Sequence, residues 1–203
     1  MYRLFLGKIS TLSTRPLPHK LAAQAPQGSR RASWLAGRVL LAQAVSPLPE
    51  IIYAEHGKPG FSGETGLWFN LSHSGDDIAL LLSDEGEVGC DIEVIRPRPN
   101  WRRLANAIFS PGEHAEVEAE HPERQLDAFW RIWTRKEAMV KQRGGSAWQI
   151  ASVDSTRGGS AWQIASVDST RGAAFPVSQI QLANLSLAVC TPTPFALKAD
   201  RIR

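Results

Sequence analysis

The sequence predicts an α+β fold, because segments with helical spacing and short apolar runs typical of strands occur in both halves of the chain. The clearest helical segments are residues 34–45 and 129–143, and the clearest strand segments are residues 78–82 and 185–190. A chain of 203 residues suits one large domain or two small ones that share a core.

The first half is expected to begin with loop structure and to continue with a helix. Residues 12–29 are rich in Pro, Ser and Gln, which favours a loop. The helix over residues 34–45 should stop at Ser46-Pro47, because the residue before a proline disfavours helical backbone. After another loop, residues 67–72 are expected to form a short strand.

Residues 78–94 predict a β-hairpin at the end of this half. Residues 78–82 are a buried apolar run, Asp84-Glu85-Gly86 suits a turn, and residues 88–94 would be the returning strand. The Arg-Pro-Arg-Pro segment that follows, residues 96–99, is expected to mark a boundary. We therefore expect an N-terminal α+β half at residues 1–98 and a C-terminal α+β half at residues 99–203.

The second half is predicted to contain two helices with defined ends. Ser110 suits the N-cap of the first helix, with Pro111 at the first helical position and Glu113 closing a capping box. The second helix, over residues 129–143, is expected to end at the glycine pair of residues 144–145.

A tandem duplication lies in this half. The fourteen residues 144–157 (GGSAWQIASVDSTR) recur without change at residues 158–171, and two short copies do not make a solenoid. We favour an insertion in a tolerant loop, because the extra loop-closure entropy costs only about half a kcal/mol. The alternative is that either copy can occupy one structural slot while the other is looped out.

Composition and charge limit the classes of partner. The net charge of +3 and the pI of about 9.1 favour an anionic partner, such as a phosphorylated cofactor, an acidic protein or nucleic acid. The basic residues are dispersed, so no nucleic-acid motif supports that last class. The chain has no apolar run of a membrane span, no signal-peptide core at its start, and no cysteine pair with zinc or disulfide spacing. We expect a cytoplasmic protein without a membrane partner.

Two carboxylates stand two residues apart in the segment Gly-Cys-Asp-Ile-Glu at residues 89–93. In a strand, Cys90 and Ile92 would face one way, and Asp91 and Glu93 would face the other. Two neighbouring carboxylates repel each other unless a cation lies between them, and their oxygens suit a hard ion such as Mg²⁺. The alternative is a solvated strand face.

A third carboxylate lies on the predicted helix of residues 129–143. Trp130, Trp133, Glu137 and Val140 fall along one helical stripe, with Lys141 beside it. A carboxylate on an apolar stripe is costly to bury unless it is paired or bound to a metal, so Glu137 is a candidate metal ligand. The alternative is a surface ion pair between Glu137 and Lys141, four residues apart.

Two further polar positions allow two interpretations each. His73 lies in a dense polar cluster, residues 70–76, where it could bind phosphate or shuttle a proton, or where the cluster could simply complete a turn. The capping role of Glu113 explains that residue locally, and it does not exclude a second role near a metal.

The chain contains five short motifs that, in their order along the sequence, resemble those of 4'-phosphopantetheinyl transferases. The resemblance is to the larger, monomeric kind, typified by the activators of surfactin and enterobactin synthetases. The chain is similar, within that group, to enterobacterial holo-acyl-carrier-protein synthases. Each motif is weak alone, but their order and spacing over residues 30–145 make the resemblance specific. The motifs are Gly57-Lys58-Pro59, FNLSHS at residues 69–74, G-x-D-I-E at 89–93 followed by Arg96, F-S-x-x-E at 109–113, and W-x-x-K-E-x-x-x-K at 133–141.

The resemblance implies a pseudo-dimer of two similar α+β halves with the active site, and coenzyme A, in the cleft between them. It implies a monomeric, Mg²⁺-dependent enzyme that transfers the 4'-phosphopantetheine arm of coenzyme A to a serine of an acidic acyl or peptidyl carrier protein and releases 3',5'-ADP. It assigns the metal to Asp91, Glu93 and Glu137. It assigns coenzyme A to Arg31, Arg38, Lys58, Pro59, Ser72, His73 and Lys141. It assigns catalytic positions to Glu137, Lys141, Lys136 and Glu113.

Two other functions compete with this one. The duplication begins just beyond the helix that contains Lys141, and a displacement of about 1 Å can cost about a hundredfold in rate. The chain could therefore be an impaired homologue that binds coenzyme A or a carrier protein without efficient transfer. A different Mg²⁺-dependent phosphoryl-cleaving enzyme, such as a nuclease, would leave the Ser-His and Lys-Glu motifs unexplained.

Overall fold

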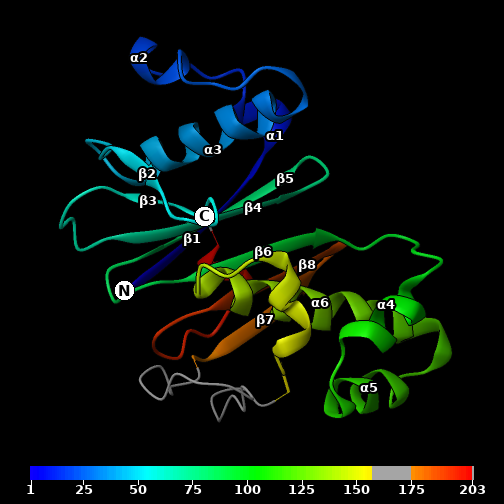
Figure 1. Ribbon diagram of the computed structural model, residues 1–203. Helices are drawn as coiled ribbons and strands as arrows, with labels where there is room; N and C mark the ends of the chain where they lie inside the picture. Colours follow the sequence, from blue (N-terminus) through cyan, green and yellow to red (C-terminus); the bar gives the residue numbers. More distant parts are fainter. Residues whose placement is uncertain (157–174, 203) are drawn as a thin grey trace.

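The computed structural model describes residues 1–156 and 175–202 and shows two antiparallel sheets stacked between two helices (Figure 1). The first sheet has the strand order β1-β5-β4, formed by Tyr2–Lys8, Asp77–Ser83 and Trp68–Ser74. The second has the order β6-β8-β7, formed by Gly89–Val94, Leu185–Cys190 and Val177–Leu182. A separate two-stranded sheet pairs β2 (Ile51–Tyr53) with β3 (Pro59–Phe61).

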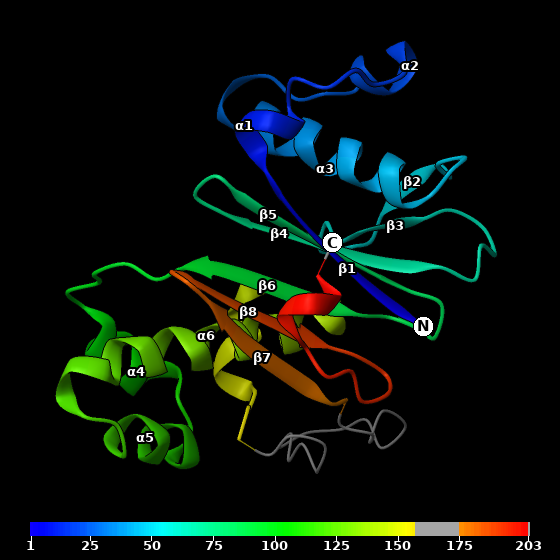
Figure 2. The same cartoon turned by 180° about the vertical axis from the view of Figure 1, so that it is seen from behind.

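Helices cover the outer faces of the two main sheets. The α-helices are α1 (Ile9–Leu12), α2 (His19–Ala22), α3 (Arg31–Ala44), α4 (Trp101–Ile108), α5 (Pro111–Glu118) and α6 (Gln125–Gln142). Short 3-10 helices are η1 (Gly28–Arg30), η2 (Pro122–Arg124), η3 (Ala147–Ser152) and η4 (Ala199–Arg201). The layers follow the order α3, first sheet, second sheet, α6 (Figures 1 and 2). This arrangement confirms the α+β fold class predicted from the sequence.

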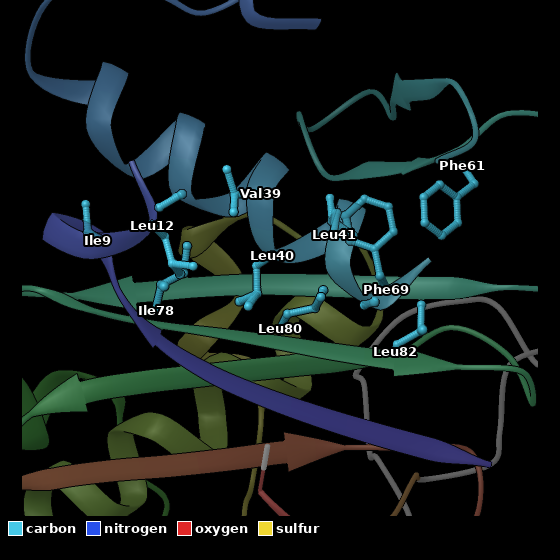
Figure 3. Close-up of a cluster of buried hydrophobic side chains, with 12 residues drawn as sticks. Ile9, Leu12, Val39, Leu40, Leu41, Phe61, Phe69, Ile78, Leu80 and Leu82 are labelled. Atoms are coloured by element: carbon cyan, nitrogen blue, oxygen red, sulfur yellow. The ribbon is translucent and has the colours of Figure 1, made fainter. Parts of the chain in front are cut away.

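The outer face of the first sheet is buried under α3. Figure 3 shows Val39 and Leu40 of α3 above Ile78 and Leu80 of β5, and all four side chains are at most 3% exposed. Each buried aliphatic side chain of this size contributes about 1.5–3 kcal/mol. The helix stops at Ala44, in agreement with the proline signal in the sequence.

The inner faces of the two sheets form a second core. Leu81 of β5 packs in one cluster with Cys90 and Ile92 of β6, and all three are fully buried. The alternation predicted for residues 88–94 is therefore confirmed, since Asp91 and Glu93 occupy the other face of β6. Figure 2 shows β6 between the first sheet and α6, so this other face is turned toward the helix.

The predicted hairpin of residues 78–94 is wrong. β5 lies between β1 and β4, whereas β6 pairs with β8, so the turn after Ser83 moves the chain from one sheet to the other. Both strands are apolar enough to be buried in a sheet, and local sequence does not reveal that their partners are distant. The chain passes from the first sheet to the second between Ser83 and Gly89. The boundary between halves at residues 98–99 stays a prediction.

The local signals at helix ends agree with the sequence in most places. Ser110 caps α5, with its hydroxyl oxygen 3.2 Å from the amide nitrogen of Glu113, and Glu113 Oε2 accepts from the Ser110 N–H at 2.8 Å. α6 ends at Gln142, followed by Gly144 with φ of +66°. The segment of residues 12–29, predicted as a loop, also contains α2 and η1, which are single turns.

The first copy of the duplication is packed on α6. Ile150 and Val153 are buried in one cluster with Val140 of the helix. The second copy, residues 158–171, lies outside the described residues. The choice between a tolerated insertion and an exchange of copies therefore stays a prediction.

Two findings bear on the cellular setting. Across residues 1–156 and 175–202, no helix combines the length and apolar character needed to cross a membrane. Cys90 and Cys190 are both buried and not joined in a disulfide.

Gly89 lies where the backbone of β6 closely approaches the backbone of α6. A Cβ at this position would overlap with the carbonyl oxygen of Ala138 and the amide nitrogen of Gln142, which are backbone atoms that cannot turn aside. We expect Gly89→Ala to lower the free energy of unfolding by about 3 kcal/mol, measured by urea denaturation. Gly60→Ala is the matched control, because its Cβ would meet nothing within 4 Å. Equal stability of the two variants would contradict this view of the β6–α6 contact.

Candidate active site

Three polar side chains of β4 satisfy the free edge of β6. β6 is an edge strand of its sheet, so alternate N–H groups point away from β8 and need other acceptors. The acceptors are side-chain oxygens of β4, which belongs to the other sheet. The pairs are Cys90 N–H with Asn70 Oδ1 at 2.8 Å, Ile92 N–H with Ser72 Oγ at 3.2 Å, and Val94 N–H with Ser74 Oγ at 3.0 Å.

The same two serines hold the carboxylates of β6. The Ser72 hydroxyl donates to Asp91 Oδ1 at 2.9 Å, and the Ser74 hydroxyl donates to Glu93 Oε2 at 3.0 Å. Asp91 is only 3% exposed, and its second oxygen, Oδ2, is buried without a hydrogen-bond partner. The pair is therefore not the solvated strand face that the sequence left open.

α6 adds a cation to this cluster. Lys141 Nζ lies 2.5 Å from Asp91 Oδ1 and donates to Ser72 Oγ at 3.0 Å. The lysine thus bonds across to β4 and β6, rather than forming the surface pair with Glu137 that the sequence allowed. Burial alone would lower the pKa of Lys141, but the charge and hydrogen bond of Asp91 outweigh it and the pKa is raised.

Glu137 lies on the same side of α6 as Lys141 and feels both carboxylates of β6. Burial raises its pKa to about 7, and the charges of Asp91 and Glu93 act in the same direction while Lys141 opposes them. The pKa of Glu93 is also raised, by burial and then by Asp91. The three carboxylates predicted from the sequence are therefore close enough to perturb one another.

His73 lies next to this cluster but on the other face of β4. It shares that face with Leu71, whereas Ser72 and Ser74 face the second sheet. Burial lowers the pKa of His73, and the charge of Lys141 lowers it further. The imidazole is therefore largely neutral at neutral pH, and it is available as a donor or an acceptor.

The donor set fits a hard divalent cation without forming a finished site. Among the residues that the structure describes, no three His, Cys, Asp or Glu side chains converge on a common metal position. However, Asp91 Oδ2 is a buried oxygen without a partner, and two further carboxylates are in electrostatic contact with it. Carboxylate oxygens beside a phosphorylated ligand are the usual environment of Mg²⁺.

Comparison with known proteins identifies the family. A family model described as the 4'-phosphopantetheinyl transferase superfamily matches residues 87–190, which include β6, α6 and β8. The chain is 71% identical over its whole length to the 4'-phosphopantetheinyl transferase AcpT of Salmonella typhi, with 98% of that protein covered. It is 68% identical over its whole length to AcpT of Escherichia coli strain K12, with 97% covered.

The chain belongs to the 4'-phosphopantetheinyl transferase superfamily. A more distant relative, the 4'-phosphopantetheinyl transferase of Bacillus subtilis, is 38% identical over 90 residues, covering 44% of this chain and 39% of that protein.

Two residues of these transferase motifs, Lys136 and Glu113, form a separate buried pair. Both side chains are fully buried, with Lys136 Nζ 2.8 Å from Glu113 Oε2. Lys136 also donates to the carbonyl oxygen of Val153, and Glu113 Oε1 accepts from the N–H of Ser155 at 2.7 Å. The pair therefore joins α5 and α6 to the segment after η3, which is a structural role.

The two arginines that the sequence resemblance assigns to coenzyme A, Arg31 and Arg38, both lie on α3. Arg31 is exposed at the start of the helix, and Arg38, seven residues later, lies on the same side. The guanidinium of Arg38 stacks 4.6 Å from the centre of the Trp34 ring and donates to the Tyr53 hydroxyl at 2.5 Å. Burial lowers the pKa of Arg38.

Lys58 is the last residue before β3, and Pro59 is the first residue of that strand. Lys58 Nζ donates to Glu87 Oε2 at 2.6 Å, to the Val88 carbonyl at 3.0 Å and to the Gln142 carbonyl at 3.3 Å. The ammonium thus lies at the carboxyl end of α6, which attracts cations. Pro59 lines a cavity of about 370 Å³ between β3 and β4.

Sequence reasoning missed the structural roles that Asn70, Ser74 and Gly89 have beside the site. The period of two that connects Asn70, Ser72 and Ser74 was visible in the FNLSHS motif, but its meaning depends on β6 lying beside that face. Gly89 was visible only as a motif letter, and its need for a missing Cβ comes from the approach of α6.

The buried ion pair makes a testable prediction. Lys136→Met would leave Glu113 charged inside the protein, so we expect a loss of about 3–5 kcal/mol in the free energy of unfolding, measured by urea denaturation. Lys8→Met is the control, because the Lys8 side chain is 57% exposed in its pair with Asp77, and its loss should change stability by less than about 1 kcal/mol. If Lys136→Met kept full stability while activity was lost, Lys136 would have a direct catalytic role instead.

The raised pKa of Glu137 predicts a pH-dependent stability. A carboxyl with a raised pKa in the folded state favours folding while protonated and loses that contribution as the pH rises through about 7. We expect Glu137→Gln, measured with a chelator, to be more thermostable than the parent chain at about pH 8 and similar to it at about pH 5. Glu118→Gln, at an exposed position on α5, is the control and should follow the parent chain. A constant difference between Glu137→Gln and the parent across this range would contradict the prediction.

Proposed function

We propose that the chain is a holo-acyl-carrier-protein synthase that transfers the 4'-phosphopantetheine arm of coenzyme A to a serine of an apo acyl or peptidyl carrier protein. The products are the modified carrier and 3',5'-ADP. Membership of the superfamily supports the reaction class. The single observation on which the proposal rests is the cluster in which Lys141 bonds Asp91 beside Glu93 and Glu137.

This cluster suits the cleavage of a pyrophosphate. The reaction needs neutralisation of the charge on the phosphate oxygens more than it needs covalent chemistry by the protein. An ammonium held at a fixed position by Asp91 and Ser72 can act on that charge without reorganising. The charge of Lys141 also acts on His73, whose imidazole can donate a hydrogen bond to a phosphate oxygen.

The proposal includes a Mg²⁺ ion held by Asp91, Glu93 and Glu137. The unpartnered Asp91 Oδ2 and the three perturbed carboxylates support these ligands. When bound, the ion would neutralise charge on the pyrophosphate of coenzyme A.

Glu137 is the better candidate for accepting the proton of the carrier serine. It belongs to the cluster with Asp91 and Glu93, where the pyrophosphate and the attacking serine would meet. Glu113, the other candidate from the sequence, is fully buried, and both of its oxygens accept hydrogen bonds from the protein. We therefore assign Glu113 and Lys136 to holding α6 in place.

The remaining contacts to coenzyme A belong to the basic residues near α3 and β3. Arg31 is exposed and available for the 3'-phosphate, and Arg38 supports the same side of the helix through its contacts with Trp34 and Tyr53. Lys58 and Pro59 would face the adenine side. In this proposal Lys58 exchanges at least one of its present acceptors for the ligand.

An acidic carrier protein would be attracted to the basic segment that follows β6. Arg96, Arg102 and Arg103 are exposed there, and Arg96 lies three residues after Glu93. Complementary charge mainly increases the rate of encounter. As part of this proposal, the enzyme acts as a monomer in the cytoplasm, where a reducing environment suits its two free thiols.

Mass spectrometry of a carrier protein tests the proposed function. Incubation of the chain with Mg²⁺, coenzyme A and an apo acyl carrier protein should add about 340 Da to the carrier, the mass of the transferred arm. Asp91→Asn should abolish the mass gain because it removes the charge at the centre of the cluster. A folded Asp91→Asn variant with full activity would exclude the proposed role of Asp91.

The alternative of an impaired binding protein is separated by the same mixture. Coenzyme A binding without any mass gain on several acyl and peptidyl carriers would favour it. Lys141 is bonded to Asp91 and Ser72 in the acidic cluster, and this placement supports the transferase.

A further inference from the structure

Ser74 uses its hydroxyl oxygen as an acceptor from β6 and its single hydroxyl proton as a donor to Glu93. The N–H of Val94 donates to Ser74 Oγ at 3.0 Å, and a backbone N–H cannot accept in return. The single hydroxyl proton is therefore available for Glu93 Oε2, also at 3.0 Å. Ser74 is buried and Glu93 is half-buried, so this bond is partly shielded from competing water.

Ser72 repeats the same arrangement one step along the strand. It accepts from the N–H of Ile92 and donates to Asp91 Oδ1, and it also accepts from Lys141. Both lone pairs and the proton of this hydroxyl are used. In each case the serine donates to one oxygen of a carboxylate on β6 and makes no hydrogen bond with the second oxygen.

Asn70 belongs to the same row of β4 side chains, but the residue that it contacts on β6 is a cysteine and not an acid. Its side-chain oxygen accepts from the N–H of Cys90, and the thiol of Cys90 lies 3.3 Å from the Asn70 carbonyl oxygen. Asn70 thus joins the two strands in the same way as the serines, but it orients no acid. The contrast separates joining the strands from orienting a carboxylate.

We infer that Ser74 is a positioning residue for Glu93, holding Oε2 so that the other carboxylate oxygen faces the metal position beside Asp91. The inference rests on the proposed function, because it assigns Glu93 to the metal. It adds a residue that acts through Glu93 and does not itself contact the substrate. Removal of a group that hydrogen-bonds to a metal ligand typically changes metal affinity by about 10–100-fold.

The test is metal binding by the protein alone, with Mn²⁺ as the probe and free Mn²⁺ measured by electron paramagnetic resonance. Ser74→Ala should weaken Mn²⁺ binding by about tenfold, because Glu93 loses the hydroxyl that fixes it. Ser74→Thr keeps a hydroxyl on a strand residue and should restore most of the affinity. The half-saturating Mg²⁺ concentration for transfer should follow the same order among these variants.

Asn70→Ala is the matched structural control. It removes a strand-joining acceptor of the same row, so it should lower the melting temperature, as Ser74→Ala also does, while leaving Mn²⁺ affinity unchanged. Equal Mn²⁺ affinity of Ser74→Ala and the parent chain, with both folded by circular dichroism, would overturn the inference and leave the proposed function intact. Equal weakening in Asn70→Ala and Ser74→Ala would overturn it as well, because the effect would then be structural. No Mn²⁺ binding by the parent chain would overturn both this inference and the proposed metal site.

Discussion

The junction of β4 with β6 is the constraint on which the site depends. β6 has an edge with backbone donors that would be buried without partners, and each such donor costs about 1–3 kcal/mol if it is left alone. β4 supplies side-chain oxygens instead of a backbone ladder, and two of these oxygens belong to serines that also bind the acids of β6. The same two serine hydroxyls therefore join the two sheets and hold the acids in place.

The charges of the site follow from this junction. Asp91 is almost completely buried, so a charge on its carboxylate needs a partner inside the protein. Lys141 of α6 is that partner. α6 can come this close because β6 begins with Gly89. Glu137, one turn before Lys141, is then held largely buried near two other acids, and its burial followed by their charges accounts for its high proton affinity.

The parts that the sequence predicted are those set by local periodicity. The alternation of Cys90 and Ile92 with Asp91 and Glu93, and the helical stripe that includes Glu137, needed only the spacing of residues along one element. The pairing of β6 with β8 could not be predicted in this way, because the two strands are separated by the whole of α4, α5 and α6. The hairpin was predicted in its place because a turn signal between two apolar runs is the commonest reason for adjacent strands to pair.

The same limit explains the side-chain roles. Nothing near Ser74 in the sequence shows that its hydroxyl meets Glu93, since their contact depends on which sheet faces which. Lys136 and Glu137 are neighbours in one motif, yet the turn of the helix sends the first into a buried ion pair and the second toward the acids of β6. A motif identifies residues that matter together, and the fold decides which of them meet.

The way the segment after η3 is bound has a consequence for how this region can evolve. Lys136 and Glu113 contact the carbonyl of Val153 and the N–H of Ser155, which are main-chain atoms present whatever the side chains are. Selection at positions 150 and 153 then acts chiefly on apolar volume, since these side chains fill the space beside α6. Apolar replacements of similar volume at these two positions would be tolerated, while loss of either charged anchor would not.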